Sequence, residues 1–207
     1  MLYSRKPVFG QIYLCYQPPS GRPGLVSQIA FWSTLIILNT LAEPSLIEPT
    51  QIDDTYEPFE QWVNFNAFAA RVLESGLVKW YHFAVWSFRD ALEEKELESK
   101  DCWYYRIRAA AQWIEQSGNM LFHSLSNTEL TERDLNNMSN GLLYQGEGGL
   151  SKERWNFWKM KFRALAKLDV SEDVKAIAIR AAEQMEEKED EENEDEEKKD
   201  EEKEEKV

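Results

Sequence analysis

The chain has 207 residues, in which 38 acidic side chains outweigh 24 basic ones and give a net charge of -14. That length suits one medium-sized domain better than two. The negative charge argues against a nucleic-acid partner, because phosphate binding requires clustered lysine and arginine side chains. Two histidines and two cysteines are too few for a cysteine-rich zinc module or a disulfide scaffold.

The N-terminal part of the chain is rich in proline and glycine. Residues 1–24 are therefore expected to form an irregular segment, and a first helix is predicted over residues 26–41. All seven prolines lie at or before Pro58. The rest of the chain thus lacks the residue that most often interrupts a helix, and its helices can run without a break.

The second predicted helix begins at Pro58 and ends at Gly76. Proline is well tolerated in the first turn of a helix, and glycine is a common C-terminal cap. Trp62 and Phe65 fall at helical spacing, and further apolar residues widen this face until little polar surface remains. We therefore expect this helix to be central in the fold.

The middle of the chain predicts three more helices. The apolar spacing of residues 77–92 indicates a third helix, followed by a solvated charged extension over residues 93–100. Asp101 suits the start of a fourth helix that Gly118 ends, and a short fifth helix is expected around residues 120–125. The polar, glycine-rich residues 126–149 are expected to form the longest loop of the domain.

Two further helices are predicted near the C-terminus, each beginning after a serine cap, Ser151 or Ser171. Beyond them, residues 186–207 hold fifteen acidic residues and five lysines. Their net charge of -10 opposes compaction, so we expect a low-complexity tail that is disordered or a frayed helix. The fold class predicted is all-α: a single domain of six or seven helices with an aromatic core over residues 25–185.

The location predicted from the sequence is intracellular, in the cytoplasm or the nucleus. The most apolar stretch is interrupted by polar residues and falls short of the roughly 20 residues that span a bilayer, so no membrane association is expected. No secretory leader is apparent either. Cys15 and Cys102 are far apart in the sequence, and reduced thiols are expected at both.

Candidate site residues are the polar side chains inside the aromatic helices. Asn66 shares a face with apolar residues, so its amide should be hydrogen-bonded. Asn66, Arg71 and Arg89 belong either to a structural network that joins helices or to a ligand pocket lined by Asn, Arg and Trp. No catalytic residue, metal site or cofactor is predicted, because the single histidines have no metal-binding or catalytic spacing.

Two blocks of sequence resemble a known family. The string W-x-N-x-N-A-F-A-A-R at residues 62–71, continuing through residues 83–93, resembles the helical fungal proteins that carry the domain of unknown function DUF3632. Residues 149–159 resemble the same family, and the alanine-rich residues 109–114 fit its pattern. The resemblance covers roughly residues 26–167 and leaves out the first 24 residues and the acidic tail. It implies a soluble, mostly helical fungal protein and supplies no activity.

The function expected from the sequence is that of a protein-interaction or scaffold module with an unknown protein partner. One alternative is a small-molecule binder or enzyme that uses the pocket candidates Asn66, Arg71 and Arg89. Another is that the acidic tail binds basic proteins such as histones, although acidic tails more often only solvate a protein. The sequence leaves the oligomeric state open.

Overall fold

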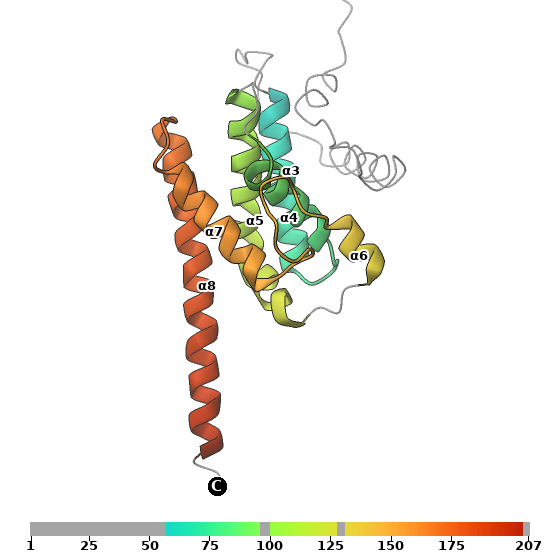
Figure 1. Ribbon diagram of the computed structural model, residues 1–207, viewed down its shortest axis with the longest axis vertical. Coiled ribbons are helices and arrows are strands. Elements are labelled where there is room, and N and C mark those ends of the chain that lie inside the picture. The colour runs from blue at the N-terminus through green and yellow to red at the C-terminus, as the bar shows by residue number, and fades with distance from the viewer. Residues whose placement is uncertain (1–56, 96–99, 128–130, 205–207) are drawn as a thin grey trace, which may run out of the picture.

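The computed structural model describes residues 57–95, 100–127 and 131–204. The predicted irregular segment 1–24 and the predicted helix 26–41 lie outside these residues. The described part is all-helical and contains no strand, which confirms the predicted fold class (Figure 1). Its elements are α3 (Glu57–Glu74), α4 (Tyr81–Phe88), the π-helical turn η1 (Arg89–Glu93), α5 (Lys100–Asn127), α6 (Glu132–Asn137), α7 (Lys152–Leu165) and α8 (Glu172–Glu204).

Helix α3 packs mainly along α5. Its bounds agree with the predicted second helix, and Gly76 adopts a φ of 73°, the left-handed conformation expected of a glycine that follows a helix. The backbone N–H of Gly76 donates to the carbonyl of Leu73 at 2.9 Å. Ala69, Ala70 and Leu73 of α3 are fully buried in the core, while Phe68 on another side of the helix is exposed.

The predicted third helix forms two elements of different geometry. It begins at Tyr81 rather than at Leu77, whose side chain is 82% exposed. The last turn, η1, is a π-helix in which the N–H of Glu94 donates to the carbonyl of Arg89 at 3.1 Å. A π turn holds more residues than an α turn, so the side chains after Phe88 are rotated away from the α-helical pattern.

Helix α5 joins the predicted fourth and fifth helices. Ser117 has non-helical backbone angles (φ -146°, ψ 23°), so the helix is kinked beside Gly118, where the sequence predicted an end. The hydroxyl of Ser117 donates to the carbonyl of Trp113 at 2.8 Å, within the preceding turn. The predicted break is therefore present as a kink.

The polar segment between α5 and α7 contains a short helix that the sequence did not predict. Helix α6 begins after Thr131, whose side chain forms a capping box with Asp134. Residues 138–150 then lead to α7, which starts as predicted: the hydroxyl of Ser151 accepts a hydrogen bond from the N–H of Arg154 at 3.2 Å.

Helix α8 is the longest element and includes most of the acidic segment. It begins after Ser171, packs on α5 and α7, and continues without interruption to Glu204 (Figure 1). The predicted boundary between residues 185 and 186 thus falls inside one helix. In Figure 1 the C-terminal end of α8 extends beyond the other described helices.

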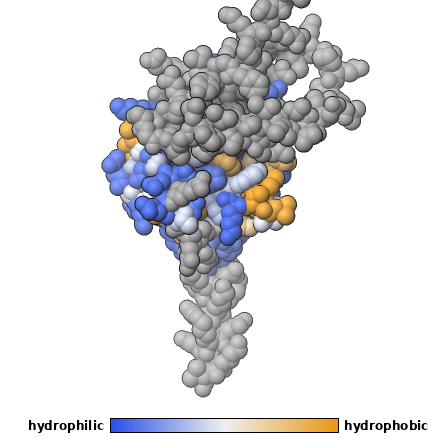
Figure 2. Space-filling view, turned by 90° about the vertical axis from the view of Figure 1, so that its right-hand side faces the viewer, coloured by the Kyte–Doolittle hydropathy of each residue, from blue (hydrophilic) through white to orange (hydrophobic). Residues whose placement is uncertain are grey.

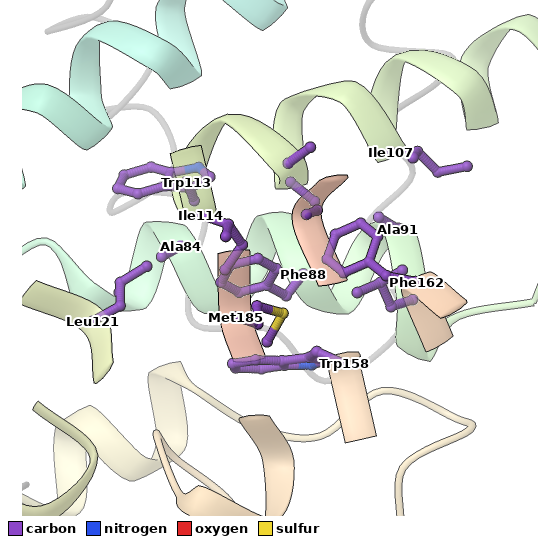
Figure 3. Packing of buried hydrophobic residues seen from close by; sticks show 14 of the residues in the cluster. Ala84, Phe88, Ala91, Ile107, Trp113, Ile114, Leu121, Trp158, Phe162 and Met185 are labelled. Carbon is purple, nitrogen blue, oxygen red and sulfur yellow. The ribbon is translucent and has the colours of Figure 1, made fainter. Parts of the chain in front are cut away.

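The core lies where α3, α4, η1, α5, α7 and α8 meet. The rings of Phe88 and Trp158 are stacked, with centroids 4.5 Å apart, and Trp113, Phe162 and Met185 complete the centre of the cluster (Figure 3). All five side chains are fully buried. Large apolar side chains buried in this way each contribute roughly 1.5 to 3 kcal/mol, so the predicted aromatic core is the main source of stability.

Candidate functional site

The most highly charged part of the interior is an ion pair between Glu93 of η1 and Arg154 of α7. Neither side chain is exposed to solvent. The guanidinium Nε donates to Glu93 Oε1 at 2.7 Å and Nη2 donates to Oε2 at 2.9 Å, which gives a bidentate pair. Bidentate pairs of this kind are both strong and geometrically specific.

Every hydrogen-bonding position of this pair is used. Besides its two bonds to Glu93, Arg154 donates from Nη1 to the carbonyls of Met138 and Gly149 and from Nη2 to the carbonyl of Ser139. The carboxylate of Glu93 also accepts from the indole Nε1 of Trp158 at 2.6 Å. The five N–H groups of the guanidinium therefore all have acceptors.

The same carboxylate fixes the loop that precedes α7. The backbone N–H of Gly141 donates to Glu93 Oε2 at 2.8 Å, and the N–H of Leu143 donates to the backbone carbonyl of Glu93 at 2.7 Å. The approach is so close that a Cβ atom on Gly141 would lie 2.6 Å from the Cβ of Glu93. Only glycine fits at this position without a shift of the loop.

This network is structural rather than catalytic. A carboxylate that acts as an acid, base or ligand needs a free lone pair within reach of a substrate. Both oxygens of Glu93 already accept two hydrogen bonds each, from side chains and backbone that bury them. The sequence predicted that Glu93 lies on a solvated helix end, and this is wrong because the π turn directs it into the core.

A second buried polar network surrounds Asn66, a predicted site residue. Its Nδ2 donates to the carbonyl of Trp62, and its Oδ1 accepts from Ser87 at 3.0 Å and from the indole of Trp113 at 2.9 Å. The expectation that a buried amide on this face is hydrogen-bonded is confirmed. The network joins α3, α4 and α5.

The other two predicted site residues lie elsewhere. Arg89 is buried in η1 and donates from Nη1 to the hydroxyl and the carbonyl of Ser139, both at 3.1 Å. Arg71 is exposed on α3. The structure therefore places Asn66 and Arg89 in separate networks and does not bring Asn66, Arg71 and Arg89 together around one cavity.

None of the three predicted site residues lines either of two depressions that lie on the described surface. The smaller, of about 150 Å³, lies between α3, α5 and α8. The larger, of about 590 Å³, lies where α5 and α8 begin. It is lined by Lys100, Asp101, Trp103, Tyr104, Tyr105, Asp169, Val170, Ser171 and Val174.

The histidines and cysteines give no catalytic arrangement among the described residues. His82 packs against the rings of Phe83 and Trp86, and burial lowers its pKa. No group of three or more potential metal ligands occurs within the described ranges, and no helix there has the length and apolarity to cross a bilayer. Cys102 is disulfide-bonded, so the predicted reduced thiol is wrong at this position.

The acidic segment begins on a basic face of α7. Arg163 pairs with Glu186 at 2.5 Å, Lys159 pairs with Glu189, and Lys152 pairs with Glu192 at 3.0 Å. The order of these contacts shows that α7 and α8 run antiparallel. The indole Nε1 of Trp155 also donates to Glu189, at 3.1 Å.

The charges of this α7–α8 contact act over a limited pH range. The hydrogen bond and the positive charge of Arg163 lower the pKa of Glu186 below its usual value. The stabilisation is therefore present above the ordinary carboxylate pKa and is lost as the pH falls through the lowered value. Because both side chains of this pair are about half-exposed, its individual contribution is small.

Exposed apolar side chains interrupt an otherwise hydrophilic surface. The side view in Figure 2 shows mostly hydrophilic described residues, with hydrophobic ones gathered in a patch at its right. The large apolar residues that are exposed are Phe68, Leu77, Leu135, Leu142, Leu143, Met160, Leu168 and Ile179. Contiguous exposed apolar patches mark interaction sites or ligand-binding grooves, whereas single exposed apolar residues are ordinary.

Comparison with known proteins identifies one family. The family model described as "Protein of unknown function (DUF3632)" matches residues 18–162, which is more than half of the chain. The match extends from the chain preceding α3 into the last turn of α7 and leaves out α8. No curated protein and no solved structure matches the chain.

Proposed function

We propose that this chain, which belongs to the DUF3632 family of proteins of unknown function, is a helical protein-interaction module whose acidic helix end binds basic proteins. The observation that carries the proposal is the continuity of α8. Its N-terminal half is part of the core, residues 186–192 are paired with α7, and the helix then continues to Glu204.

This arrangement supports binding because the protruding segment is attached to a folded body. Residues 193–204 contain eight carboxylates and three lysines. Twelve helical residues extend about 18 Å at 1.5 Å per residue. An isolated helix of this length is only marginally stable in water, but here the packed half of α8 has already formed the costly first turns. A basic partner thus meets a charged helix rather than a free coil.

A histone-binding measurement tests the proposal. We expect the full chain to bind fluorescently labelled core histones at low salt, and binding to weaken as salt rises, because such contacts are screened. Deleting residues 193–207 should weaken binding by at least about tenfold, or 1.4 kcal/mol. Replacing Glu194, Asp195, Glu196 and Glu197 by their amides should also weaken histone binding. Fluorescence anisotropy measures all three proteins.

A matched control separates the acidic end from net charge. It neutralises four exposed carboxylates of the body, at Glu132, Glu147, Asp169 and Glu183, and so removes the same charge as the variant with four amides at positions 194–197. We expect this control to bind histones nearly as well as the unmodified chain. If the control loses as much affinity as the variant with four amides, or if the deletion binds normally, the proposed role of the acidic end is wrong.

We further propose that this interaction takes place inside the cell, in the cytoplasm or the nucleus, where a histone partner is found. The disulfide at Cys102 is the observation that opposes this location, because disulfides are rare in reducing compartments. Fractionation of cells that produce the tagged full chain provides the test. Recovery with the cytoplasm or nuclei supports the proposal, and recovery from the culture medium overturns it.

A further inference from the structure

The larger of the two depressions has the size of a binding site for a small molecule. Its volume is about 590 Å³, within the range of roughly 300 to 1,000 Å³ that such sites occupy. It lies where α5 and α8 begin, and Figure 1 shows both helices starting at the same end of the described bundle. We call this depression the α5–α8 cavity.

The apolar part of the lining comes from aromatic and branched side chains. Trp103 and Val174 belong to the core and are only 8% and 5% exposed. Tyr104 and Val170 are half-buried. The guanidinium of Arg108 already lies 5.4 Å from the centre of the Tyr104 ring, so we assign no second cation to that ring. The cavity therefore offers an apolar surface, held in place by the core, against which a hydrocarbon chain can pack.

Two carboxylates also line the cavity, one beside the start of each helix. Asp101 lies in the first turn of α5, and Asp169 precedes α8. Both side chains are exposed, and neither forms an ion pair or a side-chain hydrogen bond within the described part of the chain. The raised pKa of Lys175 comes mainly from its ion pair with Glu172, at 2.9 Å, and to a smaller extent from Asp169. Both carboxylates that line the cavity are thus available to a ligand.

The charges around the cavity favour a cationic ligand over an anionic one. Helix N-termini by themselves attract anions, but the first turns of α5 and α8 already carry acidic side chains, Asp101 in α5 and Glu172 and Asp173 in α8. Among the described residues that line the cavity, Lys100 is the only basic one, against two carboxylates. An anion would therefore meet carboxylates at both helix ends, whereas ammonium groups would find partners there.

We propose that the α5–α8 cavity binds a linear aliphatic molecule that carries two or more ammonium groups, such as a diamine or a polyamine. One ammonium group pairs with Asp101 and another with Asp169, and the methylene chain between them packs against Trp103 and Val174. Methylene groups gain by leaving water, and ammonium groups gain by pairing with carboxylates, so both parts of the ligand are matched. The proposal is independent of histone binding, because the cavity and the acidic end lie at opposite ends of α8.

Isothermal titration calorimetry on the full chain tests the proposal with diaminobutane, diaminohexane and diaminooctane. We expect at least one of these diamines to bind saturably, with one molecule per chain. Octanediol, which lacks the charges, and magnesium ions, which lack the hydrocarbon chain, should not displace the diamine at equal concentration. The proposal is overturned if none of the three diamines binds saturably, or if either competitor displaces the bound diamine.

Three variants locate the binding. Replacing both Asp101 and Asp169 by asparagine should weaken it at least about tenfold. The matched control replaces Asp173 and Glu183, two exposed carboxylates of α8 outside the lining, by their amides and should keep the affinity within about twofold. Deleting residues 193–207 should also leave the affinity unchanged, and circular dichroism shows that each variant is folded. Unchanged binding by the double asparagine variant, equal weakening by the control, or loss of binding on the deletion overturns the proposal.

Discussion

Replacing Arg154 by methionine is expected to destabilise the domain by about 3 to 5 kcal/mol, because it leaves the carboxylate of Glu93 buried without its counter-charge. The substitution also removes the donors to the carbonyls of Met138, Ser139 and Gly149. Methionine keeps a similar apolar length and so preserves most of the packing. A large decrease in the free energy of unfolding would therefore come mainly from the lost ion pair and hydrogen bonds. Urea denaturation followed by circular dichroism measures the free energy of unfolding.

A double-mutant cycle shows whether the loss of stability comes from the ion pair between Glu93 and Arg154. Glu93→Gln alone should also destabilise the domain, since it leaves Arg154 charged and buried. The protein with both substitutions should lose less than the sum of the two single losses, by at least about 1 kcal/mol. Additive losses would show that the ion pair itself contributes nothing. If Arg154→Met does not fold, Arg154→Lys, which keeps the charge but not the planar fork, provides the milder test.

Replacing Trp113 by alanine is expected to cost about 3 to 5 kcal/mol, as do other large-to-small substitutions of buried aromatic residues. Trp113 is fully buried at the α5 side of the core, and Figure 3 shows it above the cluster around Phe88. Its indole also donates to Asn66 Oδ1 at 2.9 Å and to Ser87 at 3.0 Å. The substitution therefore opens a cavity and removes a donor that two helices share. Thermal and urea unfolding give the change.

Two comparison variants separate these effects. Trp113→Phe keeps most of the volume and removes the indole N–H, so it should cost about 1 to 3 kcal/mol. Met160→Ala, at an exposed position of α7, should change stability by no more than about 0.5 kcal/mol. A loss below about 1.5 kcal/mol for Trp113→Ala would contradict its place in the core.

The helices that the sequence predicted well are those in which local signals and burial agree. Helix α7 has a serine cap at Ser151 and apolar residues at helical spacing, and its N-terminus was placed correctly. Gly76 ends α3 in the left-handed conformation that glycine favours. Asn66 was expected to be hydrogen-bonded because it lies on an apolar face, and its partners confirm this. The cap of α7 and the end of α3 depend on residues close together in the sequence, whereas for Asn66 the sequence predicted the need for partners but not that they are Ser87 and Trp113.

The features that the sequence did not reveal depend on distant residues. Counting along an α-helix places Glu93 at a charged end, but the π turn rotates it inward, and its partner Arg154 lies 61 residues away. The docking of Glu186, Glu189 and Glu192 on α7 likewise requires a basic face on another helix. From charge repulsion among residues 186–207 we expected a disordered tail or a frayed helix. Ion pairs with α7 instead hold the first turns of this segment in place.

Arg71 shows a different limit of prediction from the sequence. Arg71 belongs to the string that resembles the family, yet its side chain is on the surface of α3. A sequence pattern shows which residue types occur together but not which of them face a common cavity. Asn66 and Arg89 are separated for the same reason: α3 and η1 direct them to different partners, Trp113 and Ser139.

The buried carboxylate of Glu93 also limits how far this chain can be shortened from its C-terminal side. A fragment that ends before Arg154 would retain Glu93 but lose the guanidinium that pairs with it. The carboxylate would then be a buried charge without a partner. The region shared with the family ends at residue 162, just after Arg154 and Trp158. The first half of α8 also belongs to the core, so only the part of this helix beyond Glu192 can change without loss of buried contacts.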